Sequence, residues 1–204
     1  MLTRRSLARA SLLFPALAAV AQPRIARAQT AAQAVAFVNT TAKDLIAVID
    51  STASQADKQG RLQQIVDRAV AVEQIARFCL GRFWRTATAA QQQDYVKLFH
   101  HVLLASITGH LGEYKGVTYT LGRPVPGEGG IEVPSVLNRP GAASAKLTWV
   151  VNDIGGQPKV IDVVAEGTSM RVTQRSDYDS YLNQHGGSVE ALIGALKRQA
   201  ARAG

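Results

Sequence analysis

The sequence predicts an α+β fold, a curved antiparallel sheet of about four strands covered by several helices. Three observations lead to this prediction. Apolar residues recur with the helical period over residues 31–111, alternate with polar residues over 117–166, and return to the helical period after Gly167. Helices, then consecutive strands, then helices again is an order typical of α+β domains.

The first predicted helix spans residues 31–52, where apolar side chains share one face. Gly60 and the polar residues around it are expected to interrupt the helical pattern. A second helix is predicted to begin at Leu62 and to be followed closely by an apolar run over 72–80, which Gly81 is placed to end.

A longer helix is predicted over residues 88–112. Thr88 and Gln91 have the spacing of a capping box, in which each side chain accepts a hydrogen bond from the other residue's backbone N–H. The apolar stripe of this helix consists of Tyr95, Leu98, Phe99, Val102, Leu103, Ile107 and Leu111.

Alternating residues predict strands over 117–121, 131–133, 147–151 and 159–166. Prolines and glycines over 124–130 mark the loop between the first two strands. The segment 152–156, NDIGG, is a turn that joins the last two strands in a hairpin. Two closing helices are predicted, separated at Gly186-Gly187-Ser188.

Residues 1–28 have the three-part layout of a secretory signal peptide. Residues 1–11 carry three arginines and no acid, residues 12–21 are an apolar run too short to span a bilayer, and Ala26-Arg27-Ala28 has the form of a cleavage site. We therefore expect residues 29–204 to form a single domain in the periplasm. This leader is compatible with export by the Sec route. It is also compatible with the twin-arginine route, because it contains Thr3-Arg4-Arg5-Ser6-Leu7.

The charge balance argues against a nucleic-acid partner. The chain has 23 Lys and Arg against 15 Asp and Glu, a net charge of +8, but five arginines and no acids lie within residues 1–28. The remaining 18 basic and 15 acidic residues give only +3. No concentrated basic surface of the kind that a phosphate backbone requires is visible in the sequence.

Catalytic and metal-binding motifs are missing from the sequence. The four histidines, His100, His101, His110 and His185, do not have the spacing of a metal site, and Ser169 lacks the second glycine of a nucleophile elbow. Cys79 is the only cysteine and is expected to be a small buried hydrophobic residue. We therefore expect no catalytic residues, no metal and no cofactor, and a protein that is not an enzyme.

The chain is instead rich in apolar surface on two predicted layers. The long helix contributes Tyr95, Phe99, Val102 and Leu103, and the sheet contributes Val117, Tyr119, Leu121, Leu147, Trp149, Val151, Ile161 and Val163. These residues form either a closed core or a core held open as a pocket for an apolar ligand. The periodicity of the sequence does not decide between these two alternatives. From the pattern alone, we would expect the closed core.

Residues 79–88, CLGRFWRTAT, are interpreted as a corner between two helices. Phe83 and Trp84 are expected to pack the bend against the sheet, because buried aromatic residues usually serve packing. Arg82 and Arg85 are expected to face solvent, where they are free to meet anionic headgroups or a partner.

Three ordered motifs resemble the MlaC, or toluene-tolerance, family. They are residues 80–88 followed by 91–99 (LGRFWRTAT and QQQDYVKLF), residues 162–170 (DVVAEGTSM), and the closing residues 175–178 with Gly186-Gly187. The resemblance covers residues 35–198. Arg139-Pro140-Gly141, Asp177-Tyr178 and His185-Gly186-Gly187 are closer to the hopanoid-associated HpnM branch.

The resemblance implies a soluble periplasmic lipid carrier with an apolar pocket between sheet and helices, lined by the twelve residues named above. Its cargo would be a phospholipid or a hopanoid. Its partners would be an outer-membrane lipoprotein complex and an inner-membrane transporter complex of the ABC type, in the maintenance of outer-membrane lipid asymmetry. The alternative is an accessory module that docks on a membrane transport complex and carries nothing.

Overall fold

The computed structural model describes residues 30–203 and confirms the α+β class. The expected leader, residues 1–28, lies outside the described residues. The elements are α1 (Ala31–Ile49), α2 (Gln55–Ala69), α3 (Val72–Leu80), the 3₁₀ turn η1 (Gly81–Arg85), α4 (Ala89–His110), the 3₁₀ turn η2 (Leu111–Tyr114), β1 (Thr118–Leu121), β2 (Val125–Gly127), β3 (Gly130–Asn138), β4 (Ala145–Ile154), β5 (Gln157–Ala165), β6 (Thr168–Ser169), α5 (Met170–Gln184) and α6 (Val189–Ala203).

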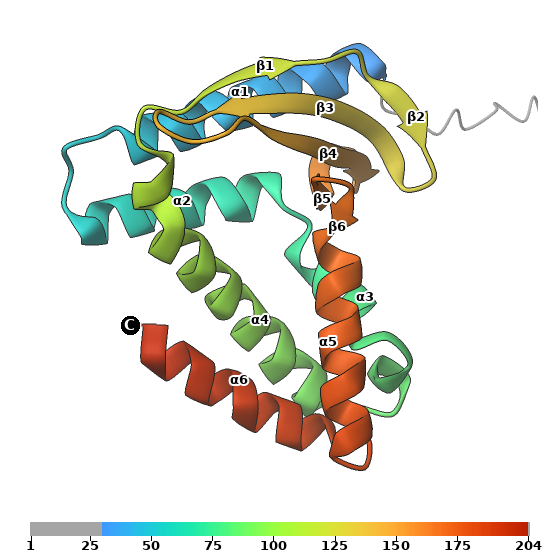
Figure 1. The fold of residues 1–204 in the computed structure, drawn as a ribbon. Helices are drawn as coiled ribbons and strands as arrows, with labels where there is room; N and C mark the ends of the chain where they lie inside the picture. Colours follow the sequence, from blue (N-terminus) through green and yellow to red (C-terminus); the bar gives the residue numbers. More distant parts are fainter. Residues whose placement is uncertain (1–29, 204) are drawn as a thin grey trace, which may run out of the picture.

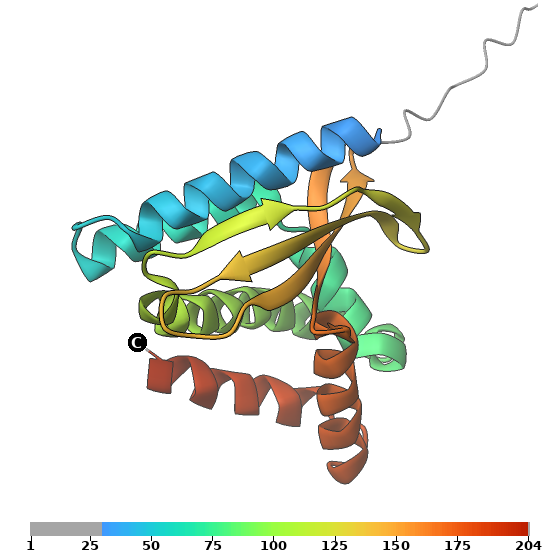
Figure 2. The same cartoon turned by 45° about the horizontal axis from the view of Figure 1, so that its top comes forward.

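The elements are arranged in two parts (Figure 1). One part is the curved sheet with α1 lying along it, and the other is a group of helices in which α4 packs against α3 and α6. Helix α5 leads from the last strand of the sheet to α6. Figures 1 and 2 both place α1 and α6 at opposite ends of the molecule.

Side chains at the helix starts explain where α1 and α4 begin. Thr30 and Gln33 form a capping box at α1, and Thr88 and Gln91 form the predicted one at α4. Helix α3, which precedes α4, ends at Gly81. This glycine has a φ of 57° and ends the helix where its position in the sequence predicts.

Helix α2 begins earlier than predicted and runs through Gly60. Ser54 caps the helix by accepting a hydrogen bond from the backbone N–H of Asp57, and the Ser54 hydroxyl donates to the Asp57 carboxylate. Gly60 is exposed and nothing lies within 4 Å of the position of its missing Cβ. The prediction of an interruption was wrong because one exposed glycine weakens a capped helix without ending it.

The sheet contains the four predicted strands and two short additional ones. Its order is β1-β3-β4-β5-β6, with β2 also paired to β3, and all these pairings are antiparallel. Hairpins join β4 to β5 through Gly155-Gly156 and β5 to β6 through Glu166-Gly167. All four of these turn residues have positive φ, the conformation that two-residue hairpin turns of type I′ require.

A β-bulge in β5 changes the face on which one predicted pocket residue lies. Val150 pairs with Asp162, whereas the next residue of β4, Val151, pairs with Val160, so Ile161 is the extra residue. Ile161 packs with Ala71 and Val150 on the face opposite to that of Val151. The prediction that Ile161 shares a face with Val163 was therefore wrong, because simple alternation fails at a bulge.

Asp162 connects the sheet to α5. Its side chain is buried and accepts hydrogen bonds from the Ser169 hydroxyl at 2.5 Å and from the Arg171 backbone N–H at 3.1 Å. The Arg171 Nε lies 3.4 Å from the same carboxylate. Ser169 in turn caps α5 by accepting from the Val172 N–H. This network gives a structural reason for the DVVAEGTSM motif: it fixes the last hairpin against the start of α5.

Buried apolar residues form separate clusters in the two parts of the molecule. The largest joins α3, α4, α5 and α6, and another lies between α1 and the sheet. Among residues 30–203, no helix combines the length and the apolar character that crossing a bilayer requires.

Candidate functional site

An open groove of about 1000 Å³ runs between α1 and the edge strand β1. Ala32 and Ala36 are four residues apart and therefore lie on the same side of α1, where their short side chains leave space beside the strand. The groove is lined from α1 by Ala32, Val35, Ala36 and Asn39, and from the sheet side by Tyr119, Thr120, Leu121 and Pro124.

The floor of this groove continues into the apolar cluster between α1 and the sheet. Ala34 and Val38 of α1 are fully buried against Val133 and Val151. Val35, Leu121 and Trp149 are partly buried against the same cluster, and Val35 and Leu121 also line the groove. Apolar surface therefore extends without a break from the open groove to the interface beneath α1.

Polar groups within this apolar region are hydrogen-bonded. The Trp149 Nε1–H donates to the Ser135 hydroxyl at 3.1 Å, and that hydroxyl donates to the Leu147 carbonyl at 3.1 Å. Ser135 is only 4% exposed, so its partners offset the cost of burying it. These contacts tie the indole N–H to the neighbouring strand, while the Trp149 side chain packs against the apolar cluster beneath α1.

Tyr119 joins β1 to α1 beside the groove. Its hydroxyl lies 2.8 Å from the Asn39 side-chain oxygen and 3.2 Å from the Asn39 carbonyl. Desolvation raises the pKa of Tyr119 above its ordinary value. The hydroxyl therefore stays protonated at neutral pH and acts as a donor to Asn39.

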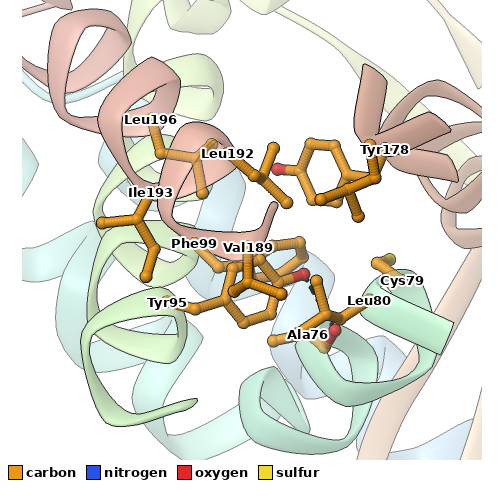
Figure 3. Packing of buried hydrophobic residues seen from close by; sticks show 11 residues of the cluster. Ala76, Cys79, Leu80, Tyr95, Phe99, Tyr178, Val189, Leu192, Ile193 and Leu196 are labelled. Atoms are coloured by element: carbon orange, nitrogen blue, oxygen red, sulfur yellow. Dashed lines mark hydrogen bonds between the residues drawn. The ribbon is translucent and has the colours of Figure 1, made fainter. Parts of the chain in front are cut away.

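The four predicted pocket residues of α4 lie elsewhere, in the helical cluster, where Figure 3 shows Tyr95 and Phe99. Tyr95 and Phe99 are buried, and Val102 and Leu103 are partly buried against the same cluster. The Tyr95 ring meets that of Tyr178 edge-on, with centroids 6.1 Å apart, and its hydroxyl donates to the Ala76 carbonyl at 2.9 Å. Desolvation, the largest cause, raises the pKa of both tyrosines above the ordinary value. These side chains fill a helical core and do not face the sheet.

The predicted sheet residues are divided between the groove and its surroundings. Tyr119 and Leu121 line the groove, and Trp149 and Val151 belong to the apolar cluster beneath α1 that adjoins it. Leu147 and Val163 share the face of Trp149 through the strand register, Val117 is buried just before β1, and Ile161 lies on the other face. The structure therefore brings four of the predicted sheet residues, Tyr119, Leu121, Trp149 and Val151, together with α1 and not with α4.

The contribution of α1 was missed by the sequence analysis. Its groove-lining residues are small or polar, so a search for large apolar side chains passes over them. The signal that was available is the pair of alanines at a helical spacing of four, next to the apolar stripe that contains Val35 and Val38.

The corner over residues 79–88 packs differently from the prediction. Phe83 and Trp84 are half-buried against the helical cluster, not against the sheet. The reason is that η1 lies at the far end of α3, where its neighbours are α4 and the Gly186-Gly187 turn; the position of a Cβ on Gly187 would be 3.2 Å from the Phe83 ring. Arg82 and Arg85 are exposed, as predicted.

Within the described part of the chain, no three His, Cys, Asp or Glu residues are grouped so that they could hold a metal ion. The environment of the buried Cys79 disfavours its thiolate on balance, although Arg171 and Arg175 lie near enough to oppose this effect. Desolvation, with a smaller effect of the Asp162 carboxylate, raises the pKa of its thiol to about 12, which is opposite to what a nucleophile needs.

A family model described as MlaC protein matches residues 39–198. Among solved structures, the fold is similar to that of the phospholipid-binding protein from Ralstonia solanacearum, which was determined in complex with a phospholipid. The TM-score is 0.72 and the sequence identity 24%, over 83% of this chain and 98% of that one. This likeness establishes the fold, and the family model covers most of the chain. The chain therefore belongs to the MlaC family, a family of binding proteins and not of enzymes, as its three motifs led us to expect.

Proposed function

We propose that residues 29–204 form a single-domain periplasmic lipid carrier, which shelters the apolar tails of a phospholipid or a hopanoid between α1 and the sheet. Family membership supports a lipid-binding role, and a protein of the same fold from Ralstonia solanacearum holds a phospholipid. The observation that carries the proposal is the apolar groove beside α1, which leads into the cluster beneath that helix.

The open groove alone would leave too much of the apolar tails exposed to water, and this exposure costs free energy. Each methylene hidden from water is worth about 0.8 kcal/mol, so about ten exposed methylenes would cost roughly 8 kcal/mol in transit. In our proposal, α1 moves away from the sheet and the tails take the place of its side chains on Val133 and Val151. Helix α1 is suited to this exchange because the residues it buries there, Ala34 and Val38, are small.

Transfer between membranes would depend on docked partners. The sequence contains no nucleotide-binding motif, so we expect release to follow differences in lipid affinity between the free and the docked carrier. The partners we propose are an outer-membrane lipoprotein complex and an inner-membrane transporter complex. The headgroup would remain in water at the mouth of the groove.

Native mass spectrometry of protein purified without added lipid tests the proposal. We expect bound lipid in the wild type, and its mass distinguishes a phospholipid from a hopanoid. Ala36→Trp fills the groove at an exposed position and should lower lipid occupancy severalfold with little change in the melting temperature. Val136→Trp is the matched control, because Val136 is 39% exposed and lies on the opposite face of the sheet.

Wild-type protein without lipid, or equal lipid occupancy in Ala36→Trp and the wild type, would contradict the proposal. The alternative is an accessory module that docks on a transport complex and carries nothing. The observation that favours it is the complete burial of Ala34 and Val38, which leaves no space beneath α1 in the described state. A delipidated protein that fails to bind an apolar fluorescent probe would support this alternative.

A further inference from the structure

A basic-aromatic patch lies where α3 and η1 meet α5, far from the groove. Two hollows of about 430 Å³ and 520 Å³ meet there and share Gly81, Arg82 and Arg175. We define the patch by the basic and aromatic residues around these hollows, Arg77, Phe78, Arg82, Trp84, Arg85 and Arg175.

Aromatic rings of the patch lie against two of its four arginines. The Arg77 guanidinium lies 5.5 Å from the centroid of the Trp84 ring, and that of Arg175 lies 4.9 Å from the Phe78 ring. A Cβ at Gly81 would lie 3.3 Å from two nitrogens of Arg175, so the absence of a side chain lets this guanidinium lie across the end of α3. Stacked guanidinium groups keep their N–H edges available, with less entropy to lose on binding.

The positive charge of the patch is only partly neutralised. Asp179 is the one acid that lines the two hollows, and it lies 3.7 Å from Arg82. Among residues 30–203, no carboxylate forms an ion pair with Arg77, Arg85 or Arg175. The patch therefore presents donors that have no anionic partner within the described chain.

We propose that this patch docks an acidic segment of a partner protein, whose carboxylates enter the hollows and bind the arginines in forked pairs. The inference rests on the proposed function in that a carrier must dock to exchange cargo. Arginine and aromatic residues are enriched at protein interfaces and lysine is depleted, and no lysine lines either hollow. Val172, 52% exposed beside Arg82 and Arg175, adds an apolar contact for the same segment.

The shape of the patch favours a protein partner over a membrane surface. A lipid surface attracts lysine and arginine alike and acts on the charge of a whole face. Here the arginines line two hollows, which the side chains of a polypeptide can enter and a planar surface cannot.

Fluorescence anisotropy with a fluorescein-labelled oligoglutamate peptide tests the proposal on the full mature protein. Changing the four arginines of the patch to glutamine should weaken binding about tenfold, the loss expected of interface hot spots. The matched control removes the same charge from exposed positions elsewhere and should change affinity less than about twofold. Its four substitutions are Lys43→Gln, Arg61→Gln, Lys97→Gln and Arg123→Gln.

Three outcomes would overturn the proposal: no binding of the peptide by the wild type, equal losses in the two glutamine variants, or wild-type affinity in a variant with lysine at all four patch positions. If the wild type binds phosphatidylglycerol vesicles but not the peptide, and only the variant with glutamine at the four patch positions loses vesicle binding, the patch would be assigned to membranes instead. Lipid occupancy by native mass spectrometry should be the same in all variants. A wild type that binds the peptide but holds no lipid would refute the carrier and leave the patch intact.

Discussion

Asp162→Asn should destabilise the protein markedly, although the two side chains have nearly the same shape. The carboxylate is 6% exposed and accepts from the Ser169 hydroxyl and the Arg171 backbone N–H, while the Arg171 guanidinium lies beside it. An asparagine keeps one oxygen acceptor. Its amide group must then face either the Arg171 N–H, which is also a donor, or the Ser169 hydroxyl, which already accepts from Val172.

The magnitude follows from one lost hydrogen bond and from the lost charge. A hydrogen bond to a charged group contributes about 1.5–3 kcal/mol, and a buried donor left without a partner costs a similar amount. We expect the free energy of unfolding to fall by about 2–3 kcal/mol, because the asparagine retains one of the two bonds. For a domain of this size the melting temperature should fall by roughly 4–12 °C.

Urea denaturation and thermal melts measure this change. Asp179→Asn is the control on the same side of α5: its side chain is 50% exposed in a surface pair with Arg82, so we expect a loss below about 1 kcal/mol. Equal losses in the two variants, or a loss below about 1 kcal/mol for Asp162→Asn, would refute the view that Asp162 fixes α5 to the sheet.

Four further predictions concern backbone conformation and burial. Gly167→Ala should lower the free energy of unfolding by about 1–2 kcal/mol, because Gly167 has a φ of 81°. Gly60→Ala should instead raise the free energy of unfolding by up to about 1 kcal/mol, because it stabilises α2. Urea denaturation measures both changes. Burial, and less strongly Asp162, raises the pKa of Cys79 from 9.0 to about 12, so iodoacetamide should label the thiol only after unfolding. Labelling of the native protein at the rate of a free thiol would contradict this. Burial raises the pKa of Tyr95 in the folded protein above the ordinary tyrosine pKa of 10.0, which applies in the unfolded chain. As the pH rises above 10.0, the unfolded chain therefore loses the Tyr95 proton first, and the folded protein loses stability. Tyr95→Phe should reduce this loss of stability, which thermal melts at a series of pH values measure.

Much of the fold could be predicted because local signals and tertiary packing agree. The capping box at Thr88, the positive φ of Gly81 and the paired glycines at 155 and 156 are local devices, and each stands where the sequence indicated. The start of α2 was misplaced because Gly60 was given more weight than the cap at Ser54. Here the hydrogen bonds of one capping residue outweigh the cost of one exposed glycine.

The candidate site was predicted less well, since it depends on which layers meet. Alternation correctly grouped Leu121, Trp149 and Val151 on one face of the sheet, but it could not show that α1, and not α4, covers that face. The bulge at Ile161 has no local signature in the sequence, and a one-residue shift moves a side chain to the other face. Long-range packing decides both points.

The separate positions of the groove and the patch would allow the proposed lipid binding and the proposed docking to be altered separately. The groove belongs to α1 and β1, the basic-aromatic patch belongs to α3, η1 and α5, and the elements lie in different parts of the molecule (Figure 1). The sheet and α5 are nevertheless joined rigidly through Asp162, whose partner Arg171 also stacks on Phe78 of the patch at 4.6 Å. These two charged contacts and the β4–β5 pairing connect the patch to the sheet face under α1. If docking alters lipid affinity, Asp162→Asn should weaken that coupling even in conditions where the variant is fully folded, while each surface retains its own ligand.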